Sequence, residues 1–216
     1  MKYDAFLFDL NGTMIDDMPY HVEAWHKILN SLGAQLTMDR VKAECYGKNE
    51  ELLDRIFPGR FTAEEKSQMI IQKERTYQET FRRQLKLLPG LSEFLDQAKS
   101  EEIRMAIGTA AIMFNVDFVL DGLNIRHYFD CIVSADEVSF SKPHPETWIR
   151  CAEKLKLSPE RCLVFEDSPK GVEAARDAGM QSVAVTTMHN EHEFSRLDNV
   201  VMIISDFNLL DVEMFR

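Results

Sequence analysis

Residues 3–13 read YDAFLFDLNGT, and the pattern of this segment is the strongest indication of the fold class. Its first part, 3–8, is a short apolar run, and its second part is a polar turn that begins with Asp9. An apolar run of this length followed by a polar turn is typical of a buried parallel strand that ends in a functional loop. Comparable apolar runs recur at 103–108, 131–134, 162–166, 182–186 and 200–204.

Helical patterns lie between several of these runs, at 145–155 and at 169–178, and Gly179 provides a C-terminal cap for the second. Strands that alternate with helices predict βαβ units and a parallel sheet covered on both faces. Residues 16–85 interrupt the alternation, because they hold no convincing strand. The periodic segments in this part all look helical, at 20–32, 39–43, 50–57 and 63–84.

The predicted architecture is therefore α/β, with a three-layer Rossmann-like core, a parallel sheet and an inserted helical cap domain. The core is expected to comprise residues 1–15 and 86–216. Residues 16–85 are expected to form a four-helix cap over the end of the first strand. A chain of this size buries roughly 70% of its unfolded surface, so hydrophobic packing suffices without a disulfide or structural metal.

Composition narrows the class of protein. The 216 residues include 45% hydrophobic and 28% charged residues, and the formal net charge is −11. An acidic surface repels phosphate backbones and anionic lipids, which argues against nucleic acid or a membrane as partner. The four cysteines show no C-x-x-C or zinc-site spacing and are interpreted as reduced thiols. The N-terminal sequence resembles neither a signal peptide nor a membrane span, so we expect a cytoplasmic enzyme or binding protein. We also expect it to be a monomer.

Polar side chains follow four of the predicted strands, and ligands gather at the carboxyl ends of strands in open α/β sheets. Carboxylates at one sheet edge could hold Mg²⁺, and a carboxylate can also attack phosphorus. A lysine would neutralise phosphoryl oxygens, while a hydroxyl and nearby backbone N–H groups would bind them. Each residue alone has a simpler explanation, as a turn residue or a surface charge. The residues concerned are Asp9, Thr109, Lys142 and the pair Glu166-Asp167.

Four motifs in fixed order carry a family resemblance: FDLNGT at 8–13, IGT at 107–109, SKP at 141–143, and FEDS at 165–168, the last followed by Gly171 and the alanine pair 174–175. Together they resemble the haloacid dehalogenase superfamily of phosphotransferases, most closely its β-phosphoglucomutase-like branch of small-molecule phosphatases and phosphomutases. The resemblance covers nearly the whole chain, including the helical cap. It implies hydrolysis of a small phosphorylated metabolite through an aspartyl-phosphate, with Mg²⁺ as cofactor.

The resemblance also implies roles for particular residues. Asp9 would be the nucleophile. Glu166 and Asp167 would hold Mg²⁺ together with Asp9 and the backbone carbonyl of Asn11. The transferring phosphate would be bound by Thr109, Ala110 and Lys142.

Asn11 departs from the family pattern, which usually has a second Asp two residues after the nucleophile, where it acts as general acid and base. An amide cannot transfer a proton, and such assistance is typically worth about 10²–10⁴-fold, or about 3–5 kcal/mol. Asn11 could be engineered, it could suit a substrate with a good leaving group such as pyrophosphate, or it could mark a slow or non-catalytic phosphate-binding homologue. We favour a natural Asn and modest phosphatase activity over a sugar phosphomutase, which needs the acid and base in both half-reactions.

Residues of the predicted cap are candidates for substrate selection. His21 and Trp25 lie four apart on one helix face, as in the related mutase, so His21 is a candidate over the site and Trp25 is expected in the cap core. Lys48 and Glu50 align with the cap loop through which family members recognise the leaving group of the substrate. The alternative is that both are solvated residues at a helix start. Lys73 is expected on a solvated helix face.

Overall fold

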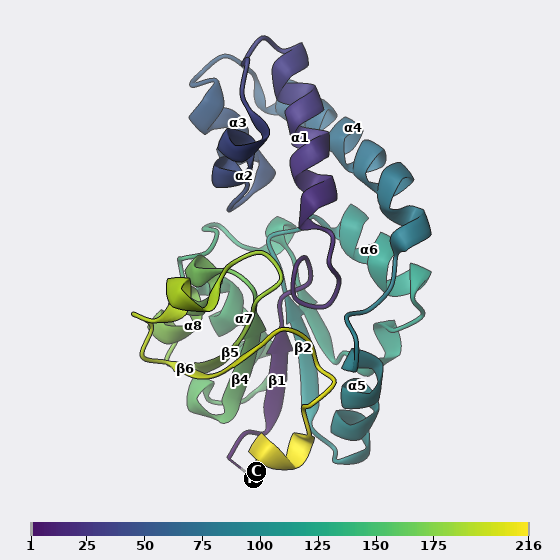
Figure 1. Cartoon of the computed structure of the whole chain (residues 1–216). Coiled ribbons are helices and arrows are strands. Elements are labelled where there is room, and N and C mark those ends of the chain that lie inside the picture. The colour runs from purple at the N-terminus through teal and green to yellow at the C-terminus, as the bar shows by residue number, and fades with distance from the viewer. Residues whose placement is uncertain (1, 216) are drawn as a thin grey trace. The chain divides into compact units, whose positions relative to one another are not determined.

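The computed structural model describes residues 2–215. Contacts divide the chain into two compact units, shown in Figure 1: a core unit, Met1–Asp16 with Lys86–Arg216, and a helical unit, Asp17–Leu85. The chain thus leaves the core unit shortly after the first strand and returns to it about seventy residues later. No helix in the described residues is long and apolar enough to cross a membrane.

The core unit is built on six parallel strands in the order β3-β2-β1-β4-β5-β6. Their bounds are β1 Ala5–Phe8, β2 Arg104–Gly108, β3 Cys131–Val133, β4 Cys162–Glu166, β5 Gln181–Val185 and β6 Val200–Ile204. Successive strands add on one side of β1 and then, from β4 onward, on the other side. The sheet therefore has its topological switch point between β1 and β4, where open α/β sheets bind ligands.

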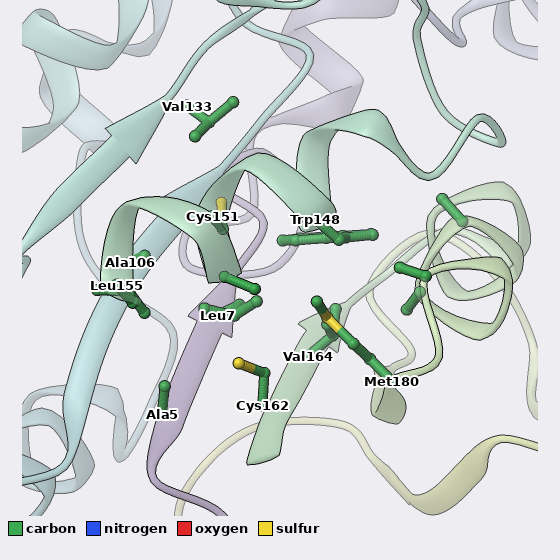
Figure 2. Packing of buried hydrophobic residues seen from close by; sticks show 14 of the residues in the cluster. Ala5, Leu7, Ala106, Val133, Trp148, Cys151, Leu155, Cys162, Val164 and Met180 are labelled. Carbon is green, nitrogen blue, oxygen red and sulfur yellow. The ribbon is translucent and has the colours of Figure 1, made fainter. Parts of the chain in front are cut away.

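Helices cover both faces of this sheet, which confirms the predicted three-layer α/β architecture. They are α5 Leu91–Ser100, α6 Met113–Gly122, α7 Glu146–Leu155 and α8 Pro169–Asp177. On one face, Ala5 and Leu7 of β1 belong to the same apolar cluster as residues of α7 and α8 (Figure 2). On the other face, the Phe6 ring stacks on Phe94 of α5 with centroids 5.4 Å apart. Successive side chains of β1 therefore point to opposite faces of the sheet and pack into the apolar core on each face.

Helix ends in the core unit follow their capping signals. Gly179, with φ +81°, follows Ala178, the C-cap residue of α8, and the amide of Met180 donates to the carbonyl of Ala175 at 2.8 Å. This confirms the predicted glycine cap, since a positive φ is least costly for glycine. The observed β1 begins two residues later than predicted, and the predicted bounds of β2, β3 and β5 differ from the observed ones by one residue. All four cysteines are free thiols; Cys151 and Cys162 are buried, while Cys45 and Cys131 are half-buried.

The helical unit consists of α1 Met18–Ser31, α2 Met38–Glu44, α3 Asn49–Ile56 and α4 Ala63–Phe81, followed by a 3-10 turn at Arg82–Gln84. Thr62 caps α4 in a capping box with Glu65, whose carboxylate accepts from the Thr62 amide at 2.8 Å. Trp25 of α1 is buried, which confirms its prediction as core. Ile70 and Phe81 of α4 are buried too, so α1 and α4 pack through their apolar faces.

Candidate active site

Three carboxylates meet at the switch point of the core sheet. Asp9 follows β1 directly, Glu166 is the last residue of β4, and Asp167 comes next. Because Phe8 of β1 is paired with Phe165 of β4, both strands end at the same level. One oxygen from each carboxylate lies within 4.8 Å of the others, and all three side chains are buried.

Lys142 lies among these carboxylates, not on the surface. Its Nζ donates to Asp9 Oδ1 at 2.6 Å, to Glu166 Oε2 at 2.7 Å and to the carbonyl of Gly108 at 3.0 Å. An ammonium group has three donors, so these contacts use its full capacity. Burial lowers the pKa of Lys142, but the charges of Asp9 and Glu166 outweigh burial and raise the pKa above its usual value. Lys142 is therefore a permanent cation in the site.

The charges of the site are unbalanced, because one ammonium group faces three carboxylates. The pKa of Asp167 is raised well above its usual value, first by burial and then by the charges of Glu166 and Asp9. The hydroxyl of Thr13 donates to Asp167 Oδ1 at 3.4 Å. With all groups ionised, two negative charges remain, which a divalent cation would neutralise. Clustered carboxylate oxygens are ligands that suit Mg²⁺, so the residues fit this ion.

Two glycines allow the carboxylates to lie against the backbone. A Cβ atom added to Gly12, whose φ is +79°, would lie 2.2 Å from Asp167 Oδ2, and one added to Gly171 would lie 2.0 Å from Glu166 Cδ. Ser168 fixes Glu166 from the same side, because its hydroxyl donates to Glu166 Oε1 at 2.8 Å and accepts from the amide of Gly171 at 3.1 Å. This role of Ser168 was not predicted from the sequence, although a serine directly before a proline at a helix start is a recognisable N-cap.

Replacing Gly171 by Ala is expected to destabilise the core unit by about 1–3 kcal/mol, because the added methyl group must displace the Glu166 carboxylate. Chemical denaturation measures this change. The control is Gly122→Ala at the exposed end of α6, where the same substitution should be neutral or stabilising by up to about 1 kcal/mol. Equal stability of the two variants would contradict the close approach of Gly171 and Glu166.

The loops around the carboxylates hold the remaining predicted core residues. Thr109 is buried directly after β2, and its Oγ1 accepts from the amide of Ala111 at 3.1 Å; Ala110 lies between them and is half-buried. Asn11 forms an isolated bridge with Ile15 in the turn after β1. Lys142 donates to the residue just before Thr109, so the ends of β1, β2 and β4 converge on one ammonium group.

His21 belongs to the helical unit, where it is part of a buried polar cluster. Its Nε2 lies 3.2 Å from Asp17 Oδ2, its Nδ1 lies 2.6 Å from Lys73 Nζ, and its ring stacks on Tyr77 at 3.8 Å between centroids. Burial and the charge of Asp17 raise the pKa of Tyr77 well above its usual value, so its hydroxyl stays protonated and donates to Asp17 Oδ2 at 2.5 Å.

The prediction of a solvated Lys73 is wrong. Its side chain is 2% exposed, and Nζ donates to both carboxylate oxygens of Glu74, at 3.0 and 3.1 Å. The mixed charge of α4 thus includes an internal ion pair, and such pairing is what permits a charged side chain inside a protein. Lys48 immediately precedes α3 and Glu50 lies in its first turn; Lys48 is half-buried and Glu50 is exposed.

A family model described as "Haloacid dehalogenase-like hydrolase" matches residues 6–185. The chain belongs to this family. The match includes Asp9, Thr109 and Glu166 at their strand ends, Lys142 in the segment between β3 and α7, and the whole helical unit. Membership of the haloacid dehalogenase-like hydrolases confirms the resemblance seen in the sequence motifs.

Relatives of this haloacid dehalogenase-like protein include both phosphatases and a phosphomutase. The chain is 31% identical to the fructose-1-phosphate phosphatase YqaB of Escherichia coli, over 85% of this chain and 97% of the relative. It is 32% identical to a phosphorylated carbohydrates phosphatase of Thermotoga maritima, over 83% of each chain. The crystal structure of β-phosphoglucomutase from Clostridium difficile superposes with a TM-score of 0.84 at 30% identity, covering 98% of this chain and 95% of the other. These similarities support membership of the chain in the β-phosphoglucomutase-like branch of the family.

Proposed function

We propose that the protein is a Mg²⁺-dependent phosphatase that hydrolyses small phosphorylated sugars or sugar alcohols through an aspartyl-phosphate at Asp9. The observation that carries this proposal is the buried group of three carboxylates and one lysine at the switch point of the sheet. A site with this excess of negative charge is suited to a divalent cation, and a substrate phosphate would complete the coordination of the ion.

In this proposal each residue of the core site has a separate task. Asp9 attacks phosphorus, the P–O ester bond breaks, and the leaving oxygen takes a proton from water to become the sugar hydroxyl. A second water then attacks phosphorus of the aspartyl-phosphate, which releases inorganic phosphate and restores the Asp9 carboxylate. Lys142 holds Asp9 in place and stabilises negative charge on the phosphoryl oxygens. Thr109 and the Ala110 amide bind the same oxygens. Asp9, Glu166, Asp167 and the Asn11 carbonyl would hold Mg²⁺, which supplies charge neutralisation when bound.

The substrate class is supported by the relatives, two of which are named for the phosphorylated carbohydrates on which they act. The helical unit is proposed to act as a cap that shields the intermediate from bulk water and selects the leaving group. His21, Lys48 and Glu50 remain the candidates in this unit for contact with the substrate.

A sugar phosphomutase is the second candidate, and the likeness to a β-phosphoglucomutase structure favours it. Asn11 opposes it, because transfer to a sugar hydroxyl needs a group that accepts and returns a proton. The two candidates differ in product. A mutase converts β-glucose 1-phosphate to glucose 6-phosphate with a bisphosphate primer and releases little phosphate, whereas a phosphatase releases phosphate from several sugar phosphates without a primer.

Mg²⁺ is expected to be required for activity and to stabilise the protein. A panel of sugar and sugar-alcohol phosphates should release phosphate with Mg²⁺ and not with EDTA. At a concentration one hundred times the Kd, the ion contributes about 2.7 kcal/mol to stability, which corresponds to a rise in Tm of about 5–10 °C. Calorimetry with and without Mg²⁺ measures this shift.

The control for the metal experiment is Asp167→Asn, which removes one charge from the site at nearly constant volume. Without metal, its Tm should equal or exceed that of the wild type, because the substitution removes the electrostatic repulsion between a buried carboxylate and its two neighbours. The rise in Tm with Mg²⁺ should be much smaller than in the wild type. An undiminished rise would place the ion elsewhere and would contradict the proposed ligands.

A further inference from the structure

Trp148 lies in the first turn of α7 and is fully buried, and Figure 2 shows its side chain among the residues of the apolar cluster. It also contacts three parts of the site. The ammonium group of Lys142 lies 4.2 Å from the centroid of its ring. Its indole Nε1 donates to the carbonyl of Gly171 at 3.1 Å. Its Cζ3 atom lies so close to Gly108 that an added Cβ there would be 2.6 Å away.

One of these contacts is with Lys142 itself, and the other two involve residues at or next to acceptors of Lys142. The carbonyl of Gly108 accepts directly from Lys142, and Gly171 packs against the carboxylate of Glu166, which also accepts from Lys142. The third acceptor is Asp9. A single indole ring therefore fixes the lysine, the end of β2 and the first turn of α8 relative to one another.

The choice of an aromatic side chain at this position has a physical reason. Lys142 is fully charged and buried, and an aliphatic neighbour would remove water from the ammonium group without replacing it. The face of an indole ring attracts a cation, and this attraction is strongest where water is excluded. The indole N–H in addition finds an acceptor in the carbonyl of Gly171, a hydrogen bond that a phenyl ring cannot make.

We propose that Trp148 is a positioning residue that holds the ammonium group of Lys142 against Asp9 and Glu166 for the phosphoryl-transfer step. Trp148 touches neither the substrate nor the metal ligands in this role; it acts through Lys142. The kinetic part of the inference rests on the proposed phosphatase function, whereas the placement of Lys142 by the indole ring does not.

The kinetic experiment compares Trp148→Phe and Trp148→Leu in the full-length protein with Mg²⁺ present. Trp148→Leu removes the ring and should lower kcat about 3- to 30-fold, with a smaller effect on KM. Trp148→Phe keeps a ring face over Lys142 and should stay within about threefold of the wild type. Trp148→Met replaces the leucine variant if that variant does not fold.

The matched control is Leu155→Ala, on the same helix and in the same apolar cluster. It should lower the Tm as core truncations do, and leave kcat unchanged. The inference is wrong if kcat falls by the same factor in Leu155→Ala and Trp148→Leu when both have the same Tm. It is also wrong if Trp148→Phe is as slow as Trp148→Leu, because Trp148 would then only fill the core.

A second readout does not depend on activity. In NMR spectra, the ring current of Trp148 should shift the ε-methylene protons of Lys142, assigned by their loss in Lys142→Arg, away from those of the other lysines. The shift should persist in Trp148→Phe and disappear in Trp148→Leu. An unshifted Lys142 signal in the wild type overturns the inference. Without any phosphatase activity in the wild type, this measurement still decides the placement of Lys142, while the proposed function fails separately.

Discussion

Replacing Asp9 by Asn is expected to lower kcat by at least about 10⁴-fold, below the detection limit of a phosphate-release assay. An amide is a poor nucleophile toward phosphorus, and the two side chains have nearly the same volume, so the loss should come from chemistry and not from misfolding. The Asn oxygen can still accept from Lys142, which donates to Asp9 Oδ1 at 2.6 Å in the wild type. The Tm without metal should therefore be retained.

The control for Asp9→Asn is Asp4→Asn, near the opposite end of the same strand. Asp4 pairs with Arg161 at the surface, away from the carboxyl ends of the strands. Its removal should cause at most a small fall in Tm, because exposed ion pairs contribute little, and should leave kcat within about threefold of the wild type.

Trapping the covalent intermediate gives a direct measurement of the same role. Rapid denaturation during turnover, followed by borohydride reduction, should convert a phosphorylated Asp9 to homoserine, identified by peptide mass spectrometry. Homoserine at another acidic residue, or full activity in Asp9→Asn, would contradict the proposed nucleophile.

Replacing Asn11 by Asp is expected to raise kcat for sugar phosphates by at least about tenfold. The new carboxyl group can protonate the leaving oxygen and later accept a proton from water, which the Asn11 amide cannot do. The gain should depend on the leaving group. Sugar phosphates need protonation of a strongly basic alkoxide, whereas p-nitrophenyl phosphate releases a weakly basic phenolate and should gain little.

The control for Asn11→Asp is Asn11→Ala, which removes the amide without supplying an acid. It should show no gain with either class of substrate. An equal gain in the alanine variant would mean that the amide itself obstructs turnover. The absence of any gain in the aspartate variant would mean that Asn11 is matched to a different reaction, such as hydrolysis of pyrophosphate.

The strands and the core site could be predicted because their signals are local. The run Tyr3–Phe8 is apolar on both faces of β1, and Asp9 follows it directly. Glu166 likewise ends β4, so the parallel topology was enough to suggest that it meets Asp9. Lys142 lies well beyond the end of β3, in the segment before α7, and strand topology alone does not place it. The helix α5 was not predicted, although its buried residues recur at helical spacing; they are Leu91, Phe94, Leu95 and Ala98.

Roles that depend on tertiary contacts could not be predicted from the sequence. Nothing near Trp148 indicates that its ring will lie over Lys142 and not simply fill the core. Lys73 looks like one more charge on a mixed helix, and only the approach of α1, which brings His21 to it, shows that it is internal. His21 is 52 residues from Lys73, and the Gly171 carbonyl that accepts from Trp148 is 23 residues from it, so neither role has a local signal in the sequence.

The distance along the chain between the partners of the core site affects when the site can form during synthesis. Lys142 is 133 residues from Asp9, and Thr13 is 154 residues from Asp167. A nascent chain that has emerged only as far as α6 has the proposed nucleophile but neither the lysine nor the other two carboxylates. More than three quarters of the polypeptide must therefore be synthesised before the proposed cation site is complete, so stalled or truncated products are expected to be inert.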